Sequence, residues 1–260
     1  MFVLAAVILA GVALFMNYSD DGGASKILIS DATSSHVEGE ERAVQVVLKI
    51  ANSGIPQKIV SVQSREATSA VFEGAQESYP LVLAANASAS FSTDGVFILL
   101  QGVAGPLDDG RLIPIDIALE PAGTISTKVR FANQTLVDHS KHAGMAHMMV
   151  HSVQDDQAIP TLDAKVVHDP AQSSWSFNAK TENFQFLPEM ADKEHVEGTG
   201  HGHIYLNGMK LGRYFGGGWY LGQLPPGKHQ VRLTLNTNDH KTYQFDGKPI
   251  EAVVEVDVKE

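Results

Sequence analysis

The sequence predicts an all-β protein built from two β-sandwich domains, and three observations carry this prediction. Hydrophobic and polar residues alternate with the period of two that a half-buried strand requires, as in AVQVVLKI at residues 43–50. Groups rich in Asn, Asp, Pro and Gly, which favour turns, separate these segments at short intervals. No segment carries a convincing 3.6-residue apolar repeat, and short strands at regular spacing are typical of a sandwich or barrel.

The expected strands fall into two sets. The first set comprises residues 43–50, 58–62, 97–100, 113–119 and 124–131. The second set comprises residues 164–167, 174–179, 184–186, 203–206, 210–214, 229–235 and 252–258, and predicts an Ig-like sandwich. Within it, Asn207-Gly208 separates two strands, and this dipeptide is the strongest short signal of a β-hairpin.

Composition divides the chain of 260 residues into four parts. We expect a hydrophobic segment at 1–23, a first sandwich at 24–137, a linker at 138–160 and a second sandwich at 161–260. The apolar run of residues 1–16 is short for a spanning helix and matches the core of a signal peptide. The predictions are therefore a cleaved signal peptide or an uncleaved membrane anchor, with a periplasmic or other extracytoplasmic location. A buried helix is the alternative.

Charge and cysteine content exclude several classes of function. A net charge of −11 without any Lys/Arg cluster argues against nucleic-acid binding, which requires basic surface. The absence of cysteine excludes disulfides, thiolate metal sites and a cysteine nucleophile. Soft-metal chemistry would have to use methionine sulfur and histidine nitrogen, a pair that favours copper outside the cytoplasm.

The linker concentrates those two residue types in the segment DHSKHAGMAHMMVH at residues 138–151. Cu(I) accepts two to four soft ligands, and a mobile chain can pass the ion on by ligand exchange. Zn, Ni or Cu(II) could bind the imidazoles alone. A solvated linker of accidental composition and an amphipathic helix packed through methionines are the alternatives. The candidate metal ligands are His139, His142, Met145, His147, Met148, Met149 and His151.

The densest histidine cluster is HVEGTGHGHIYLNG at residues 195–208. On a strand, His201 and His203 point to the same face as Tyr205, so that both imidazoles can bind one ion. We expect His195, folded back across a glycine-containing turn, and His240 to complete the ligand set. Asp239 is the candidate acceptor that orients an imidazole. A hydrogen-bonded structural role for the pair is the alternative.

Other candidates are better explained by packing or turns. His229 alternates with apolar residues and is expected to face the core or an edge, and His168 is expected in a turn. Met190 and Met209 are expected to pack rather than bind metal. The aromatic residues around the glycine run at 216–218 are expected to fill a sandwich core or to shield a site, and the run is not followed by a helix, as a phosphate loop would be.

Three segments carry a resemblance to a known family, namely AVQVVLKIANSG, KIVSVQS and RLIPIDIALEPAGTISTKVRF at 111–131. They are similar to the first strand and turn, the next strand and the closing pair of strands of the PCuAC family of periplasmic copper chaperones, which residues 26–151 resemble. The resemblance implies a cupredoxin-like sandwich, often followed by a His/Met-rich extension. The usual ligands are missing, because Gly74 stands near the expected histidine and 96–100 lacks His and Met.

Residues 164–258 are similar to an uncharacterised bacterial β-sandwich domain of exported proteins that often accompanies copper-related modules. The positions that carry the likeness are His195, His201, His203 and His240. This resemblance implies a suspected metal site and no reaction.

Together, these features predict an extracytoplasmic copper-binding protein that acts in copper trafficking or homeostasis with a donor or acceptor metalloprotein and catalyses no reaction. Zinc is a possible second metal. One alternative is a structural or adhesive protein without metal. Another is a copper oxidase or zinc hydrolase in which Glu182 or Glu197 acts as the base.

Overall fold

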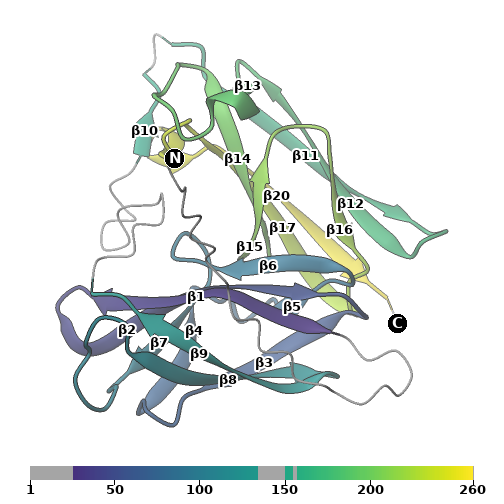
Figure 1. Cartoon of the computed structure of the whole chain (residues 1–260). Helices are drawn as coiled ribbons and strands as arrows, with labels where there is room; N and C mark the ends of the chain where they lie inside the picture. The colour runs from purple at the N-terminus through teal and green to yellow at the C-terminus, as the bar shows by residue number, and fades with distance from the viewer. Residues whose placement is uncertain (1–25, 134–149, 155–156, 260) are drawn as a thin grey trace, which may run out of the picture.

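The computed structural model describes residues 26–133, 150–154 and 157–259, and it confirms the all-β architecture (Figure 1). Among these residues the only helical element is the 3₁₀ turn η1 (Pro188–Met190). The predicted leader at 1–23 and most of the His/Met-rich segment lie outside the described residues. Within the described part of the chain, no helix is long and apolar enough to cross a membrane.

The N-terminal domain pairs its strands in the order β4-β7-β2-β1-β9-β8-β3-β5, and β6 also pairs with β2. Its core is a cluster of buried aliphatic side chains centred on β2, β7 and β8, with Phe91 and Phe131. The strands are β1 (Ile27–Val37), β2 (Glu40–Asn52), β3 (Gln57–Gln63), β4 (Ser69–Glu73), β5 (Val82–Leu83), β6 (Ala87–Phe91), β7 (Phe97–Gln101), β8 (Leu112–Glu120) and β9 (Gly123–Phe131).

The C-terminal domain has two sheets that share one apolar core. One sheet has the order β20-β17-β14-β15, and the other has the order β11-β12-β16. Phe177 and Leu221 from the second sheet pack with Ile204 and Leu233 from the first. The strands are β10 (Val150–Ser152), β11 (Thr161–Asp169), β12 (Ser174–Glu182), β13 (Gln185–Phe186), β14 (Thr199–Leu206), β15 (Met209–Tyr214), β16 (Gly218–Gly222), β17 (Gly227–Asn236), β18 (Thr242–Phe245), β19 (Lys248–Pro249) and β20 (Glu251–Val258).

The predicted hairpin between β14 and β15 is confirmed. Asn207 and Gly208 have φ angles of 50° and 83°, the positive values that a two-residue hairpin turn with the twist of its strands requires. This turn also contacts the other domain, because the carbonyl oxygen of Gly208 accepts a 3.0 Å hydrogen bond from the amide of Val96.

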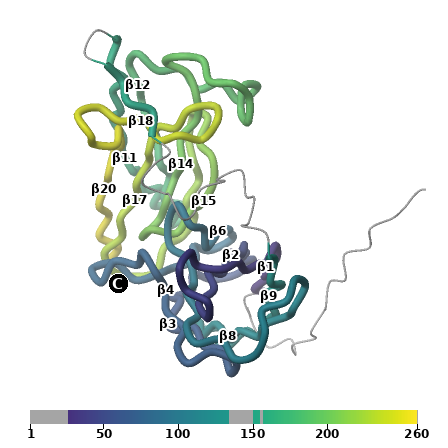
Figure 2. Tube along the Cα trace, turned by 90° about the vertical axis from the view of Figure 1, so that its left-hand side faces the viewer, coloured from purple at the N-terminus to yellow at the C-terminus, as the bar shows by residue number. Residues whose placement is uncertain are grey.

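The two domains are stacked against each other (Figure 2). They share both backbone pairing and apolar packing. Strand β15 pairs with β6 at Lys210 and Ser90, so that the hydrogen-bonded ladder continues from one domain into the other. Val82 and Ala84 belong to the C-terminal core cluster, whereas Met209 packs in the N-terminal one. The packing role expected for Met209, the first residue of β15, is therefore confirmed. These contacts hold the β6–β7 turn beside β14.

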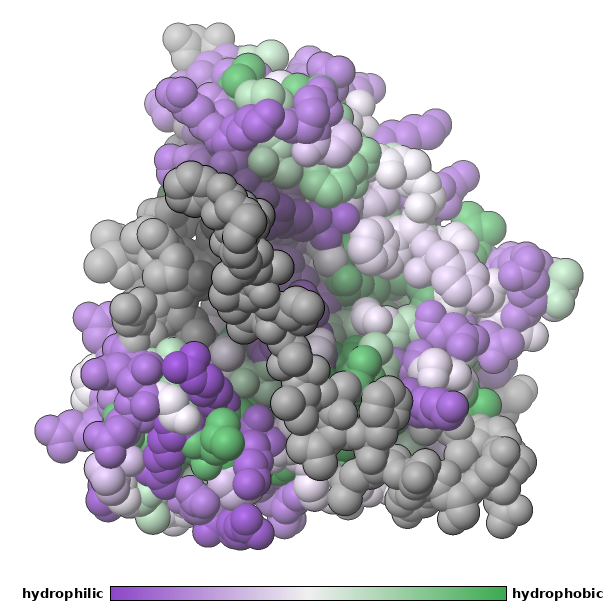
Figure 3. All heavy atoms as spheres, viewed as in Figure 1, coloured by the Kyte–Doolittle hydropathy of each residue, from purple (hydrophilic) through white to green (hydrophobic). Residues whose placement is uncertain are grey.

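A cavity of about 170 Å³ lies at this junction. Val82, Leu83 and Ala87 line it from one domain, and Leu211 and Leu221 line it from the other. Hydrophobic residues are visible between the two domains in Figure 3. No histidine lines this cavity among the described residues, so the histidine groups lie elsewhere.

Two local predictions were wrong, and one long strand was missed. Residues 150–152, predicted to belong to the linker, form β10, which pairs in parallel with β18. His168, predicted in a turn, lies on β11, where its ring centroid is 4.5 Å from that of Trp175. Strand β1 was not predicted, because its polar residues lack a period-two pattern and Asp31, with a φ of 52°, accompanies a register shift.

Candidate metal centre

Strand β14 places two imidazoles side by side in the protein interior. It pairs with β15 on one side and β17 on the other, and every one of its residues is buried. The alternate positions are glycines because neighbours approach too closely for a side chain. A Cβ atom at Gly202 would lie 2.6 Å from Leu233, and one at Gly200 would lie 1.9 Å from the carbonyl oxygen of Asn236. The motif GHGH therefore directs His201 and His203 to one face.

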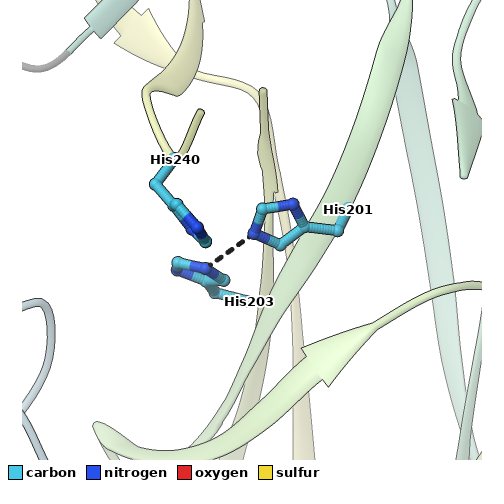
Figure 4. Close-up of side chains that lie close together, drawn as sticks. All are labelled: His201, His203 and His240. Carbon is cyan, nitrogen blue, oxygen red and sulfur yellow. Dashed lines mark hydrogen bonds between the residues drawn. The ribbon is translucent and has the colours of Figure 1, made fainter. Parts of the chain in front are cut away.

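His240 approaches this pair from the turn between β17 and β18 (Figure 4). It has a φ of 71°, and its amide donates a 3.0 Å hydrogen bond to the carbonyl of Thr237. The ring centroid of His240 is 4.8 Å from that of His201 and 6.0 Å from that of His203. One ligand atom from each of the three side chains lies within 4.8 Å of the others. We call these residues the three-histidine group.

Burial keeps these imidazoles uncharged at neutral pH. His201 is fully buried and His203 is 5% exposed. Burial, together with the neighbouring imidazoles, lowers the pKa of His201 to about 2. Burial also lowers the pKa of His203 to about 4, although the hydrogen bond to Asp94 opposes that shift. The pKa of His240 is lowered by burial as well, against the opposing effect of Asp192. Neutral imidazole is the form that binds metals.

Asp94 orients His203 from the other domain. Its Oδ2 lies 3.0 Å from Nδ1 of His203, and it also accepts hydrogen bonds from Lys210 and Tyr205. Burial alone would raise the pKa of Asp94, but the hydrogen bond from His203 and the charge of Lys210 hold it well below its usual value. Donation from Nδ1 to this carboxylate leaves Nε2 of His203 with its lone pair, facing Nε2 of His201 at 3.0 Å.

Asp192 is the carboxylate partner that orients His240. Its Oδ1 lies 2.6 Å from Nε2 of His240, and both of its oxygens bind the guanidinium of Arg213 at 2.9–3.0 Å. The hydrogen bonds from Arg213 and His240 lower the pKa of Asp192 far below its usual value. Two of the three imidazoles thus have a carboxylate partner. By contrast, Nδ1 of His201 is buried and has no hydrogen-bond partner among the described residues.

The structure separates some of the predicted ligands. His195 does not join the three-histidine group and instead lies in another group with His151 and Glu197. Asp239 orients none of the three imidazoles, because it bonds with Thr237 and Lys241. Both of these corrections concern loops, whose course the sequence does not define. The remaining predicted ligands, which lie outside the described residues, are His139, His142, Met145, His147, Met148 and Met149.

His229 is the core-facing residue that its alternation predicted. It is fully buried on β17, and its ring lies 2.8 Å from the carbonyl oxygen of Pro225 and 3.0 Å from the amide of Asn207. Both ring nitrogens therefore have hydrogen-bond partners, and no other imidazole lies beside them among the described ring contacts.

Sequence reasoning missed Asp94, Asp192, Arg213 and Lys210. Asp94 precedes Gly95 in a dipeptide that favours turns, and it lies 111 positions from Tyr205, to which it is hydrogen-bonded. An acidic residue in a turn gives no sign of a contact at that separation. For Asp192, the spacing to Arg213 likewise carries no recognisable motif.

The fold and the site together define a two-domain all-β protein with a buried group of three neutral imidazoles beside the domain junction. No family model matches this chain, and no curated protein matches it. Solved structures are similar in fold. The apo PCuAC domain of PmoF1 is 20% identical and covers 44% of this chain and 98% of its own, with a TM-score of 0.38.

Two further structures show the range of the similarity. Copper(I)-bound DR1885 from Deinococcus radiodurans is 19% identical and covers 40% of this chain and 76% of its own, with a TM-score of 0.34. The CupB2 chaperone of Pseudomonas aeruginosa is 14% identical and covers 90% of this chain and all of its own, with a TM-score of 0.25. At such identities and scores, these likenesses define no function for this chain. The resemblance expected for the second domain stays a prediction.

The buried imidazoles predict a steep loss of stability in acid for the metal-free protein. Between pH 6.5 and about pH 4, His201 and His203 stay neutral when folded but bind protons when unfolded, so the free energy of unfolding falls as pH falls. Each group contributes about 1.4 kcal/mol per pH unit in that window. We expect His201→Gln to reduce the slope by about one proton in urea unfolding curves recorded at several pH values with chelator. Parallel slopes for both proteins would contradict this assignment.

Proposed function

We propose that this protein binds one copper ion in the three-histidine group, outside the cytoplasm, and serves copper trafficking or homeostasis without catalysing a reaction. One observation carries the proposal: three buried imidazoles converge within 4.8 Å of one another while carboxylates fix two of them. In a tetrahedral site with 2.0–2.1 Å bonds, ligand nitrogens lie about 3.3 Å apart. The Nε2 atoms of His201 and His203, 3.0 Å apart, are already near that spacing, and the ligand atom of His240 would move toward them to hold an ion.

The hydrogen bonding of the pair favours metal binding over a structural role. The Nε2 atoms of His201 and His203 face each other at 3.0 Å. Because the rings are neutral and His203 carries its proton on Nδ1, only one proton, that of His201, can lie between these two atoms. Nδ1 of His201 has no partner among the described residues, whereas both ring nitrogens of His229 are hydrogen-bonded. A metal ion in place of the shared proton would bond both Nε2 lone pairs, with the proton of His201 moved to its Nδ1.

Three arguments favour copper among the metals that imidazole binds. Divalent copper binds nitrogen sites more tightly than zinc or nickel does. The chain has no cysteine, so a soft ion must be bound through imidazole and thioether groups. The His/Met-rich segment at 138–151 supplies both donors, and its C-terminal end is anchored close to the group, because Val150 pairs with Thr242, two residues beyond His240.

That proximity supports a role for the segment in transfer. Ions that exchange between thioether and imidazole ligands can move to a donor or acceptor metalloprotein without leaving a ligand shell. We propose this as the reason for the segment. The extracytoplasmic location rests on the hydrophobic residues 1–16, whose composition matches an export signal.

The carboxylates beside the group support holding rather than catalysis. A general base must be free to accept a proton. Asp94 is shared among His203, Lys210 and Tyr205, and Asp192 is bound to Arg213 and His240. Glu182, the other candidate base, lies exposed at the end of β12, and Glu197 belongs to the other histidine group.

Replacing the strand pair tests the proposal. We expect His201→Gln/His203→Gln to lose one tightly bound Cu(II), because two of the three ligands are removed while the shape of the strand is kept. Competition titration against a chelator of known affinity measures the loss, and circular dichroism checks the fold. Substituting His229 with Gln, another buried histidine of the same domain, is the matched control and should retain the site. Full stoichiometry and affinity in the double variant would refute the proposal.

Asp94 offers a test that changes no ligand. Asp94→Asn removes the charge that fixes the tautomer of His203, and loss of such a partner weakens metal sites by roughly 10- to 100-fold. The dissociation constant for Cu(II) should rise by that factor, with an unchanged stoichiometry of one. The control is Asp109→Asn, at an exposed ion pair with Arg130. Equal affinities for the two variants would show that the carboxylate does not support the site.

A further inference from the structure

We propose that the protein has a second, independent site for a divalent transition-metal ion, formed by His151, His195 and Glu197. No residue of the three-histidine group takes part in it, so the site does not depend on copper binding there. One ligand atom from each of the three residues lies within 4.8 Å of the others.

The three residues come from two segments that fold together at one end of the C-terminal domain. His151 lies on β10, and His195 and Glu197 lie in the loop that precedes β14. Oε2 of Glu197 is 3.1 Å from Nε2 of His151 and 3.6 Å from Nε2 of His195. The two imidazole centroids are 4.6 Å apart. The distances from the carboxylate oxygen to the two ring nitrogens are thus close to the about 3.3 Å that separates ligand atoms in a tetrahedral site.

A buried aromatic residue supports both imidazoles. The ring of Tyr243 meets His151 edge-on at 4.8 Å and His195 at 5.6 Å between centroids. Its hydroxyl lies 3.3 Å from Nε2 of His195 and donates to the carbonyl oxygen of Thr199. Tyr243 packs with Val153, Phe184 and Leu235 in a separate apolar cluster. The site therefore rests on rigid packing, not on a flexible loop alone.

The donor set differs in chemistry from the three-histidine group. Two imidazoles and a carboxylate form a harder set, which suits Zn(II) or Cu(II) better than Cu(I). The same combination, with water in the fourth position, binds zinc in known zinc sites. Access also differs, because the side chain of Glu197 is 48% exposed, whereas those of His151 and His195 are 21% and 17% exposed. An ion can reach this site directly from solvent.

The simpler explanation is an ion pair between a protonated histidine and Glu197. A single ion pair uses one of the two histidines, whereas Oε2 of Glu197 lies close to a ring nitrogen of both. A protonated His195 would also leave a buried N–H group at Nδ1 without a partner among the described residues.

Zn(II) titration of the full chain tests this site once the competing ligands are removed. The background protein carries His201→Gln and His203→Gln, together with His139→Gln, His142→Gln and His147→Gln. We expect it to bind one Zn(II). In that background, Glu197→Gln should weaken binding at least 10-fold, because the carboxylate is a ligand. Glu182→Gln, at an exposed carboxylate outside both groups, should leave the affinity unchanged.

Two results would overturn the proposal: the background protein binds no Zn(II), or Glu197→Gln binds it as tightly as Glu182→Gln does. Circular dichroism and thermal unfolding show whether each protein is folded, and the half-exposed Glu197 can be changed with little effect on packing. Because the background lacks the strand pair, failure here leaves the copper proposal intact. Likewise, a failure of the copper proposal would not argue against the site formed by His151, His195 and Glu197.

Discussion

The contact between Asp94 and His203 is the interaction on which the site depends. It joins the two domains, and it fixes which nitrogen of His203 carries the proton, so that the other faces His201 at 3.0 Å. Neither domain could build this arrangement alone. The β15–β6 pairing and the insertion of Met209 into the other core hold the carboxylate in place. The junction thus determines the chemistry of a site whose ligands all belong to the C-terminal domain.

This arrangement has an energetic cost that the fold must offset. The buried imidazoles and the partly buried carboxylate of Asp94 lose hydration, and only paired and hydrogen-bonded groups recover it. Lys210 compensates Asp94, and Arg213 compensates Asp192, which leaves the imidazoles neutral and available. Nδ1 of His201, which has no hydrogen-bond partner among the described residues, remains a cost. Polar groups retained in a core at such expense are expected to serve binding rather than stability, which is the basis of the proposed function.

Much of the fold was predictable because its strands are defined by local sequence patterns. Period-two alternation located most long strands, and the same period placed His201 and His203 on one face. The predictions failed where residues in contact lie far apart in the sequence, or where the course of a loop determines the position of a side chain. Asp94 reaches the site across more than a hundred residues, and His195 was assigned to the wrong group because a turn of unknown direction separates it from β14. Strand β1 is stabilised by its pairing with β2 and β9, not by its own residue pattern.

X-ray absorption at the copper edge, on protein loaded with one equivalent of copper, tests the central claim most directly. The three-histidine group predicts three imidazole nitrogens at about 2.0 Å and no sulfur, a distance typical of metal–imidazole bonds. A spectrum dominated by thioether sulfur would place the ion in the His/Met-rich segment instead. It would contradict the assignment of the buried imidazoles as the copper site.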